Sequence, residues 1–336
     1  MSARPVGPPV GLALCGTGGI ARRFFVPAIR QVPQARLAAV LSRDLARGRA
    51  FADEFEIPHA HDSLESLLED TTVQAVIVAS PDGSHETQVI AAARAGLHVL
   101  CEKPMAPTSA ACERMAATVA QSGVTFAMGY SFRFLNSLRS VAQLLQARRL
   151  GPVRFARARF TSKVPASADP WRNDPCLASS WVMSRIGTHL LDLFRWWFGE
   201  PDAVQGIMVA PRDGGPHEEL AVVVATFPGG LVAELVVSVL VDGGNGLDIY
   251  GEEGILTAEN VFRYSPEPAS IVLNGSPIAC EQNDVFAEEI ADFVGAILSG
   301  RAPRTGVDDG VRNVWLMEQA RQGRTRRGAM APGSAG

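Results

Sequence analysis

A glycine-rich turn near the start of the chain narrows the choice of fold more than any other segment. An apolar strand expected at 10–15 runs directly into Gly16-Thr17-Gly18-Gly19-Ile20-Ala21, and a helix is expected at 22–31. This is the spacing G-x-G-x-x-G/A in its required order of strand, turn and helix, which binds the pyrophosphate of a dinucleotide. The N–H groups at the helix start favour the phosphates. The residues expected to bind the cofactor here are Gly16, Thr17, Gly18, Gly19 and Ile20.

The end of the second strand, expected at 36–41, bears on which dinucleotide would bind. An acidic residue at this place bonds the ribose 2′-hydroxyl of NAD, whereas an arginine pairs with the 2′-phosphate of NADP. Ser42 and Arg43 follow this strand, which favours NADP as cofactor and leaves NAD possible. In the competing interpretation, Asp44 only caps the helix expected at 45–55 and Arg43 is solvated.

Apolar strands and helices alternate up to Gly129. Further strands are expected at 75–79, 97–102 and 125–128, and further helices at 64–69, 85–95 and 109–121. This α/β order predicts a parallel, doubly wound sheet of the Rossmann type. We therefore expect an NAD(P)-binding domain at residues 1–129.

The run Leu97-His98-Val99-Leu100-Cys101-Glu102-Lys103-Pro104 ends one of these strands in an acid, a base and a proline. Open α/β sheets bind ligands beyond the carboxyl ends of such strands, so Lys103 is expected at the mouth of a crevice. Pro104 keeps the backbone at Lys103 extended. Alternation places Glu102 and Lys103 on opposite faces, where they could address different parts of one ligand. The alternative is a solvated charge pair that closes the strand.

Beyond Gly129 the pattern changes to short strands on tight turns. After a helix at 135–148, strands are expected at 153–161, 203–209, 219–227, 231–239, 246–250, 255–259 and 270–273, and helices at 285–299 and 307–321. This predicts an α+β domain with a large, mostly antiparallel sheet at 130–325, followed by a flexible tail at 326–336. Strand 231–239 is apolar on both faces apart from Glu234, which favours a homodimer or homotetramer through this sheet.

Composition limits the partners. The 336 residues carry a net charge of -4, which argues against nucleic acid and anionic membranes and favours a small-molecule substrate. The chain shows no apolar run of about 18 residues and no signal-peptide core, so we expect a cytoplasmic protein. The five cysteines are an odd number without a close pair, which is typical of reduced thiols. We expect no disulfide and no metal site.

One stretch interrupts the strand pattern of the second half. If the residues at 184–197 form a helix, Arg185, His189 and Asp192 lie on one face at spacings of four and three. Three proton-capable side chains on an apolar helix indicate a functional site, in which Asp192 could orient the imidazole of His189. The alternative is a histidine that belongs to the core.

Together these segments resemble the Gfo/Idh/MocA family of NAD(P)-dependent oxidoreductases, which includes glucose-fructose oxidoreductase and inositol dehydrogenase. The resemblance covers nearly the whole chain, and Glu-Lys-Pro after His-Val-Leu-Cys is highly specific for the family. It implies hydride transfer between a nicotinamide and a sugar-like alcohol or ketone. The segments that carry the resemblance are 16–21, 80–85, 95–104, Tyr130-Ser131-Phe132-Arg133-Phe134, 150–153 and 187–192.

The resemblance also implies roles for single residues. Lys103 matches the catalytic lysine of the family and His189 its catalytic histidine, and Glu102 matches a residue near the nicotinamide ribose. Ser80 and His85 fall in a matching segment, so the residues expected to bind cofactor also include Ser80, His85, Glu102 and Lys103.

Arg185 departs from the family pattern, which usually has Asp four residues before the histidine. A cation near Lys103 lowers the pKa of the lysine and attracts an anionic group. Either the substrate carries a carboxylate or phosphate, or another residue relays the proton, or the protein binds nucleotide without turnover. The expected substrate contacts are Arg133, Arg172, Arg185 and Asp192.

These observations predict an NADP(H)-dependent oxidoreductase that acts on a secondary alcohol or ketone of a sugar, polyol or related cyclic compound. The alternative is a catalytically silent NAD(P)-binding sensor or regulatory protein on the same fold, which Arg185 favours. A third hypothesis is a tightly held cofactor that is oxidised and reduced internally during an elimination or glycoside cleavage.

Overall fold

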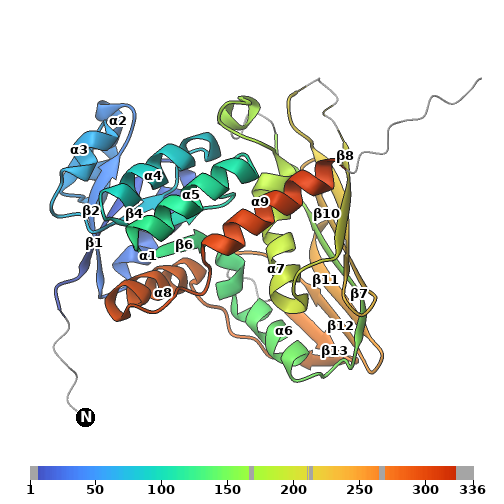
Figure 1. Cartoon of the computed structure of the whole chain (residues 1–336). Helices are drawn as coiled ribbons and strands as arrows, with labels where there is room; N and C mark the ends of the chain where they lie inside the picture. Colours follow the sequence, from blue (N-terminus) through green and yellow to red (C-terminus); the bar gives the residue numbers. More distant parts are fainter. Residues whose placement is uncertain (1–6, 166–169, 210, 212–214, 265–268, 323–336) are drawn as a thin grey trace, which may run out of the picture.

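The computed structural model describes residues 7–165, 170–209, 211, 215–264 and 269–322, which form two sheets joined by helices (Figure 1). The predicted tail at 326–336 lies outside the described residues. In the described part of the chain, no helix has the length and apolar character needed to cross a membrane.

The first sheet has six parallel strands in the order β3-β2-β1-β4-β5-β6, as the doubly wound pattern predicts. The order reverses next to β1, so the crevice that binds nucleotides in such folds opens at the carboxyl ends of β1 and β4. The short edge strand β3 was not predicted. The strands are β1 (Val10–Cys15), β2 (Ala35–Leu41), β3 (His59–His61), β4 (Ala75–Val78), β5 (His98–Glu102) and β6 (Phe126–Gly129).

Helices connect these strands on both faces of the sheet. The helix predicted at 22–31 begins instead as a π-helical turn, η1 (Ala21–Phe25), and continues as α1 (Val26–Arg30). Side-chain caps fix the starts of two helices: Asp44 accepts a hydrogen bond from the Arg47 amide, and Thr108 accepts one from the Ala111 amide. The other segments are α2 (Leu45–Phe55), α3 (Leu64–Leu68), η2 (Asp82–Ser84), α4 (His85–Arg94) and α5 (Ser109–Ser122).

The second sheet has eight strands in the order β14-β13-β12-β11-β7-β10-β9-β8. Only β7 and β10 run parallel among its neighbouring strands, so the predicted mostly antiparallel sheet is confirmed. The strands are β7 (Val153–Thr161), β8 (Ala203–Val209), β9 (Leu220–Phe227), β10 (Leu231–Ser238), β11 (Gly244–Gly251), β12 (Ile255–Glu259), β13 (Ser270–Leu273) and β14 (Ser276–Ile278).

Helices fill the space between the two sheets, where α6, α7 and α9 lie on the side of the second sheet that faces the first (Figure 1). The helix predicted at 135–148 is preceded by a 3₁₀ turn and begins one residue later. The segments here are η3 (Ser131–Phe134), α6 (Asn136–Gln146), η5 (Pro170–Asn173), η6 (Met183–Gly187), α7 (Thr188–Phe198), α8 (Val285–Ser299) and α9 (Val307–Gln322).

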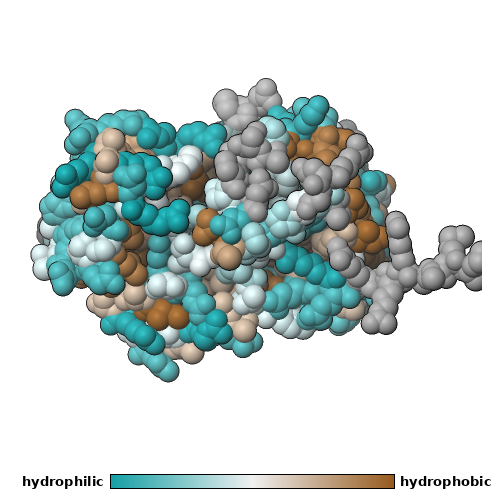
Figure 2. Space-filling model, turned by 90° about the horizontal axis from the view of Figure 1, so that it is seen from above, coloured by the Kyte–Doolittle hydropathy of each residue, from teal (hydrophilic) through white to brown (hydrophobic). Residues whose placement is uncertain are grey.

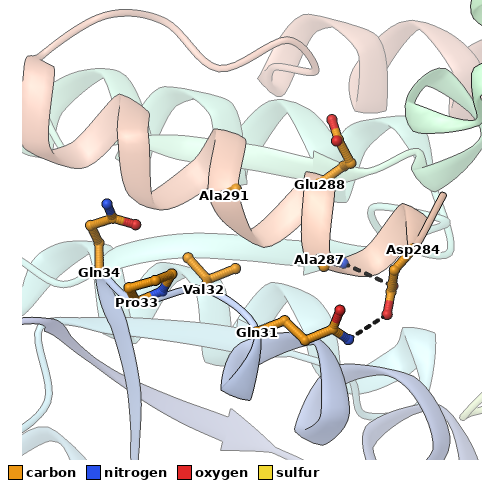
Figure 3. Close-up of a pocket in the computed structure, with 8 residues that line it drawn as sticks. All are labelled: Gln31, Val32, Pro33, Gln34, Asp284, Ala287, Glu288 and Ala291. Carbon is orange, nitrogen blue, oxygen red and sulfur yellow. Dashed lines mark hydrogen bonds between the residues drawn. The ribbon is translucent and has the colours of Figure 1, made fainter.

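The last two helices return to the first sheet. Phe286 of α8 stacks on Phe24, and Asp284 accepts a hydrogen bond from Gln31 in a shallow pocket beside α1 (Figure 3). In α9, Glu318 accepts a hydrogen bond from the Ser109 amide of α5 at 2.8 Å. The first sheet ends with β6 at the predicted boundary, but these contacts bind both halves together, and the domain limits stay a prediction.

The outer face of the second sheet carries exposed apolar side chains. A Cβ at Gly206 would lie 2.7 Å from the Ala320 carbonyl oxygen of α9, so Gly206 faces inward and Ile207 faces away from the helices. Ile207 is 65% exposed, and Val224 and Ile255 are also exposed. Seen from above, apolar residues gather at the end of the molecule that the second sheet forms (Figure 2).

Candidate active site

Lys103 lies directly after β5, and its side chain reaches the start of the helix that carries His189. Its Nζ donates hydrogen bonds to the carbonyl oxygens of Ser184 at 3.3 Å and Arg185 at 3.0 Å, both in the π-helical turn η6. The ammonium is therefore positioned by backbone groups of the second half of the chain. The predicted alternative of a solvated charge pair is wrong, because Glu102 is 5% exposed.

Burial moves the pKa values of Glu102 and Lys103 toward each other. Burial raises the pKa of the Glu102 carboxyl to about 7, although the Lys103 charge opposes this. Burial lowers the pKa of Lys103 to about 8; Glu102 opposes the shift, and the charges of Arg172 and Arg185 add to it, as predicted for Arg185. A lysine with this pKa can gain or lose a proton near neutral pH.

His189 lies on α7 and is 2% exposed. Its ring stacks on Phe132, with 4.3 Å between centroids, and meets the edge of Tyr130. Burial and the Lys103 charge hold its pKa well below the usual range, so the imidazole is neutral. Its Nδ1 is buried and has no hydrogen-bond partner among the described residues, which is costly unless a ligand supplies one.

The prediction that Asp192 orients His189 is wrong. Asp192 accepts hydrogen bonds from Arg133 Nε at 2.7 Å and Nη2 at 2.6 Å, and from Asn313 Nδ2 at 3.0 Å. Three residues along an α-helix leave two side chains about 60° apart around its axis, which is enough for Asp192 to face η3 and α9 instead. Arg133 also pairs with Asp309 at 2.8 Å. Arg133 and Asp192 thus bond each other inside the fold, which argues against the predicted contact of both with substrate.

The prediction of one regular helical face through Arg185 is also wrong, because residues 183–187 form the π-helical turn η6. This turn carries the backbone carbonyls that hold Lys103. The Arg185 side chain lines a small cavity at the ends of β7 and β10, together with Ser162 and Ser238. Arg172 lies against the ring of Trp171, 4.2 Å from its centroid.

His85 is buried, and both of its ring nitrogens lie at hydrogen-bond distance from backbone carbonyl oxygens. Nδ1 is 3.0 Å from the Pro104 oxygen and Nε2 is 2.9 Å from the Ser80 oxygen. The ring therefore joins the loops after β4 and β5, and its nitrogens are engaged by protein in place of the predicted direct cofactor contact. The Ser80 hydroxyl donates to Gln88 Oε1 at 2.8 Å.

The glycine-rich turn has the shape that a dinucleotide needs. Gly16 has φ of 118°, and a Cβ there would lie 2.8 Å from the Ala79 carbonyl oxygen, so only glycine fits. A Cβ at Gly18 would meet no atom within 4 Å, which leaves open space beside the backbone. The turn leads directly into η1, and the free amides of a helix start favour an anion. These residues fit a pyrophosphate.

The buried Ser42 follows the end of β2, and two arginines, Arg43 and Arg47, come after it in the chain. Asp44 caps α2, as the competing interpretation proposed, and its carboxylate accepts from the Arg47 amide at 3.0 Å. Arg47 Nε also donates to the Ser42 hydroxyl at 3.2 Å, and Arg43 is exposed beside it. Ser42, Arg43 and Arg47 therefore fit a phosphate, and the cap does not exclude this. Arg47 was missed, although an arginine three residues after the strand-end acid was visible in the sequence.

Two family models match the chain. The model described as "Oxidoreductase family, NAD-binding Rossmann fold" matches residues 10–130, and the model described as "GFO/IDH/MocA C-terminal domain" matches residues 138–257. The chain belongs to the Gfo/Idh/MocA family of oxidoreductases. The family to which the motifs pointed is therefore confirmed, and with it an NAD(P)-binding Rossmann fold.

Curated relatives cover most of the chain. D-xylose 1-dehydrogenase (NADP(+)) 2 from Haloferax volcanii is 31% identical over 303 residues, which are 89% of this chain and 92% of that protein. Inositol 2-dehydrogenase 2 from Saccharopolyspora erythraea is 30% identical over 301 residues, 85% of each chain. The family members that this chain resembles in sequence thus include dehydrogenases.

Solved structures agree over nearly the whole length. The aldose-aldose oxidoreductase from Caulobacter crescentus, complexed with glycerol, has a TM-score of 0.84 at 28% identity. KijD10, a 3-ketoreductase from Actinomadura kijaniata in complex with NADP and TDP-benzene, has a TM-score of 0.86 at 25% identity. Each comparison covers 94% of this chain and 98% of the other.

Asp82 is a further polar residue of this Gfo/Idh/MocA site that the sequence reasoning missed. It lies in η2, in the segment between β4 and α4, and it is 2% exposed. Its charge acts on Lys103, and its Oδ2 has no hydrogen-bond partner among the described residues. The segment Ser80-Pro81-Asp82 belonged to the motif, but nothing in the sequence indicated that the carboxylate is buried.

Proposed function

We propose that this chain is an NADP(H)-dependent oxidoreductase that interconverts a secondary alcohol and a ketone of a sugar, polyol or related cyclic compound. One observation carries the proposal: the Lys103 amine is held at a strand end by the η6 carbonyls, next to the buried Glu102. The named relatives, which act on xylose, inositol and aldoses, support this substrate class.

The cofactor would lie along the carboxyl edge of the first sheet. The turn of Gly16, Thr17, Gly18, Gly19 and Ile20 would bind its pyrophosphate. Ser42 and Arg43, with Arg47, would bind the 2′-phosphate of NADP, which Arg pairs with better than it does with a hydroxyl. Glu102 would accept a hydrogen bond from the nicotinamide ribose, and Ser80 would line the same crevice. The bound cofactor supplies or accepts the hydride.

Lys103 would move the proton at the reacting oxygen. In the direction of oxidation its neutral amine accepts the hydroxyl proton, and in the direction of reduction its ammonium donates to the carbonyl oxygen. The neutral His189 would form a hydrogen bond with the substrate through Nδ1, which has no partner among the described residues. Arg133 and Asp192 would position this helix through their mutual bonds, without touching the substrate.

Arg185 and Arg172 would select the substrate. Both lie close enough to Lys103 to affect its pKa, so a ligand at the Lys103 amine meets their positive charge. A sugar or polyol that bears a carboxylate or a phosphate would gain from this, and the TDP-benzene in the KijD10 complex supports an anionic substituent. The silent nucleotide sensor remains the alternative, because Arg185 departs from the family pattern, which usually has Asp four residues before the histidine.

We also propose that the chain is cytoplasmic and forms a homodimer or homotetramer through the outer face of the second sheet. The five free cysteines support a reducing compartment. The exposed Ile207, Val224 and Ile255 give that face the apolar character of an interface.

The test begins with fluorescence titration of the purified chain with NADPH and NADH. A panel of polyols and keto-sugars, with and without carboxylate or phosphate, is then followed by nicotinamide absorbance. We expect tighter binding of NADPH and turnover on an anionic member of the panel. Tight NADPH binding without turnover on any member would contradict the enzyme and favour the sensor, especially if Arg185→Asp created activity.

A further inference from the structure

A second group of proton-binding side chains lies at the far edge of the first sheet. His59 and His61 begin and end β3, which β2, β1 and β4 separate from the strand of Lys103. Residues two apart on a strand point to the same side, so both imidazoles project from one face of β3. Asp70, in the loop after α3, meets them there.

The three side chains converge on one point. His59 Nδ1 lies 2.6 Å from Asp70 Oδ2, and His61 Nε2 lies 3.1 Å from the same oxygen. One nitrogen or oxygen from each residue lies within 4.8 Å of the other two. The ring planes are 87° apart, so the imidazoles approach this point from different directions.

Thr72 and Arg36 hold the carboxylate in place. Asp70 Oδ1 accepts hydrogen bonds from the Thr72 amide at 2.9 Å and from its hydroxyl at 2.6 Å. The Thr72 carbonyl oxygen in turn accepts from Arg36 Nη2 at 2.8 Å. With Oδ1 engaged, Oδ2 is turned to the imidazoles. The Asp70 side chain is 6% exposed and that of His59 is 44% exposed. The carboxylate is therefore buried and fixed by its hydrogen bonds, and the side of the site at His59 is open to water.

We propose that His59, His61 and Asp70 bind a divalent first-row transition-metal ion, with Zn²⁺ as its representative. Two imidazole nitrogens and one carboxylate oxygen are a donor set that Zn²⁺, Co²⁺ and Ni²⁺ accept and that Mg²⁺ and Ca²⁺ do not favour. The open side leaves a coordination position for water. The Thr72 bonds to Asp70 are the outer-shell support that ligands of such sites usually have.

This site is separate from the proposed dehydrogenase chemistry. The metal would tie the edge strand β3 to the loop before β4 and so stabilise the sheet. It would also brace the cofactor side, because the Ser42 amide donates to the His61 carbonyl oxygen at 3.0 Å. The spacing of the cysteines predicts no metal site, whereas the signal here is the His-x-His spacing on a strand with an acid nine residues later.

The test is calorimetric titration of the full-length, untagged chain with ZnCl₂ after removal of metals by a chelator. We expect one equivalent to bind with micromolar affinity and Mg²⁺ to give no binding. His59→Gln and His61→Gln should each weaken Zn²⁺ binding by at least about tenfold. With Co²⁺, the wild type should develop visible absorption bands that His61→Gln abolishes.

Two controls separate this site from other zinc ligands. Glu69→Gln removes the exposed carboxylate next to Asp70 and should leave the binding unchanged. A Cys176→Ser/Cys280→Ser variant, which lacks the two cysteines that are not buried, should still bind one equivalent. Circular dichroism of each metal-free variant checks that it folds. If His61→Gln fails to fold, the test rests on His59→Gln, because His59 is the most exposed of the three ligands.

Three results would overturn the proposal. They are absence of Zn²⁺ binding at millimolar concentration, unchanged affinity in folded His59→Gln and His61→Gln, or loss of the single equivalent in the cysteine variant. In each case the three side chains would form only a hydrogen-bonded cluster.

Discussion

Glu102 and Asp192 are two buried carboxyl groups near the proposed catalytic residues, and they differ in the number and charge of their hydrogen-bond partners. Asp192 accepts two bonds from the Arg133 guanidinium and a third from Asn313, so the fold supplies partners for its charge, although burial still raises its pKa. For Glu102 the described residues supply one amide, that of Lys103, at 3.2 Å, and burial raises its pKa to about 7. A carboxylate with a full set of partners supports the structure, whereas one left short of partners is available to a ligand or a proton.

The largest effect on activity should come from removing the Lys103 amine, which lies next to Glu102. We expect Lys103→Met to lower kcat by about 10³ or more, because it removes the proposed proton donor and acceptor. The NADPH dissociation constant should change little. Steady-state kinetics on the best substrate of the panel and fluorescence titration measure both.

Lys163→Met is the matched control, because this lysine is exposed, and it should leave kcat unchanged. If Lys103→Met weakened NADPH binding but kept the wild-type kcat at saturating NADPH, Lys103 would be a cofactor ligand without a catalytic role.

Substitution of Asp192, in contrast, should lower the stability of the fold. Asp192→Ala leaves the Arg133 guanidinium, which is 10% exposed, with Asp309 as its remaining carboxylate partner. We expect the free energy of unfolding to fall by about 3–5 kcal/mol, as for removal of one partner of a buried ion pair. Denaturant unfolding measures this change.

Asp309→Ala is the comparison variant. The Asp309 side chain is 21% exposed, so its loss should cost clearly less than the loss of Asp192. Equal losses of unfolding free energy in the two variants would contradict the special structural role of Asp192. An Asp192→Ala protein that is as stable as the wild type but lacks turnover would place Asp192 in the chemistry and remove the contrast with Glu102.

A smaller effect is expected for the exposed arginines Arg43 and Arg47. Arg43→Ala combined with Arg47→Ala should reduce the preference for NADPH over NADH by about tenfold or more, since a charge-assisted pair with phosphate contributes on the order of 1.5–3 kcal/mol. The ratio of the two dissociation constants gives the result. Arg49→Ala, on the same helix as Arg47, should leave this ratio unchanged; an unchanged ratio in the double variant would contradict the assignment of Arg43 and Arg47 to the 2′-phosphate.

The two regions also differ in how far the sequence could predict them. The glycine-rich turn and the strand that ends at Lys103 are local patterns, so their structure follows from spacing and order. The edge strand β3 was missed because it has only three residues and is partly exposed. The π-helical turns η1 and η6 were missed because the apolar spacing of a helix does not reveal a local change in its hydrogen bonding.

Contacts between distant residues set the partners of Asp192. Its partners Arg133 and Asn313 lie 59 and 121 residues away in the chain, whereas His189 is three residues away. Spacing on one helix therefore suggested the wrong partner. The same limit hid the burial of Asp82.

The pH dependence of oxidation in the wild type and in Glu102→Gln tests the central claim most directly. Oxidation needs the neutral Lys103 amine, whose pKa burial lowers to about 8, so kcat/KM should rise with pH through a midpoint near pH 8 and then level off. Glu102 favours the Lys103 ammonium, and its loss should move the midpoint of this rise to lower pH. The same midpoint in both proteins, or a midpoint near that of an ordinary lysine, would contradict the assignment of Lys103 as the reacting base whose pKa burial and Glu102 set.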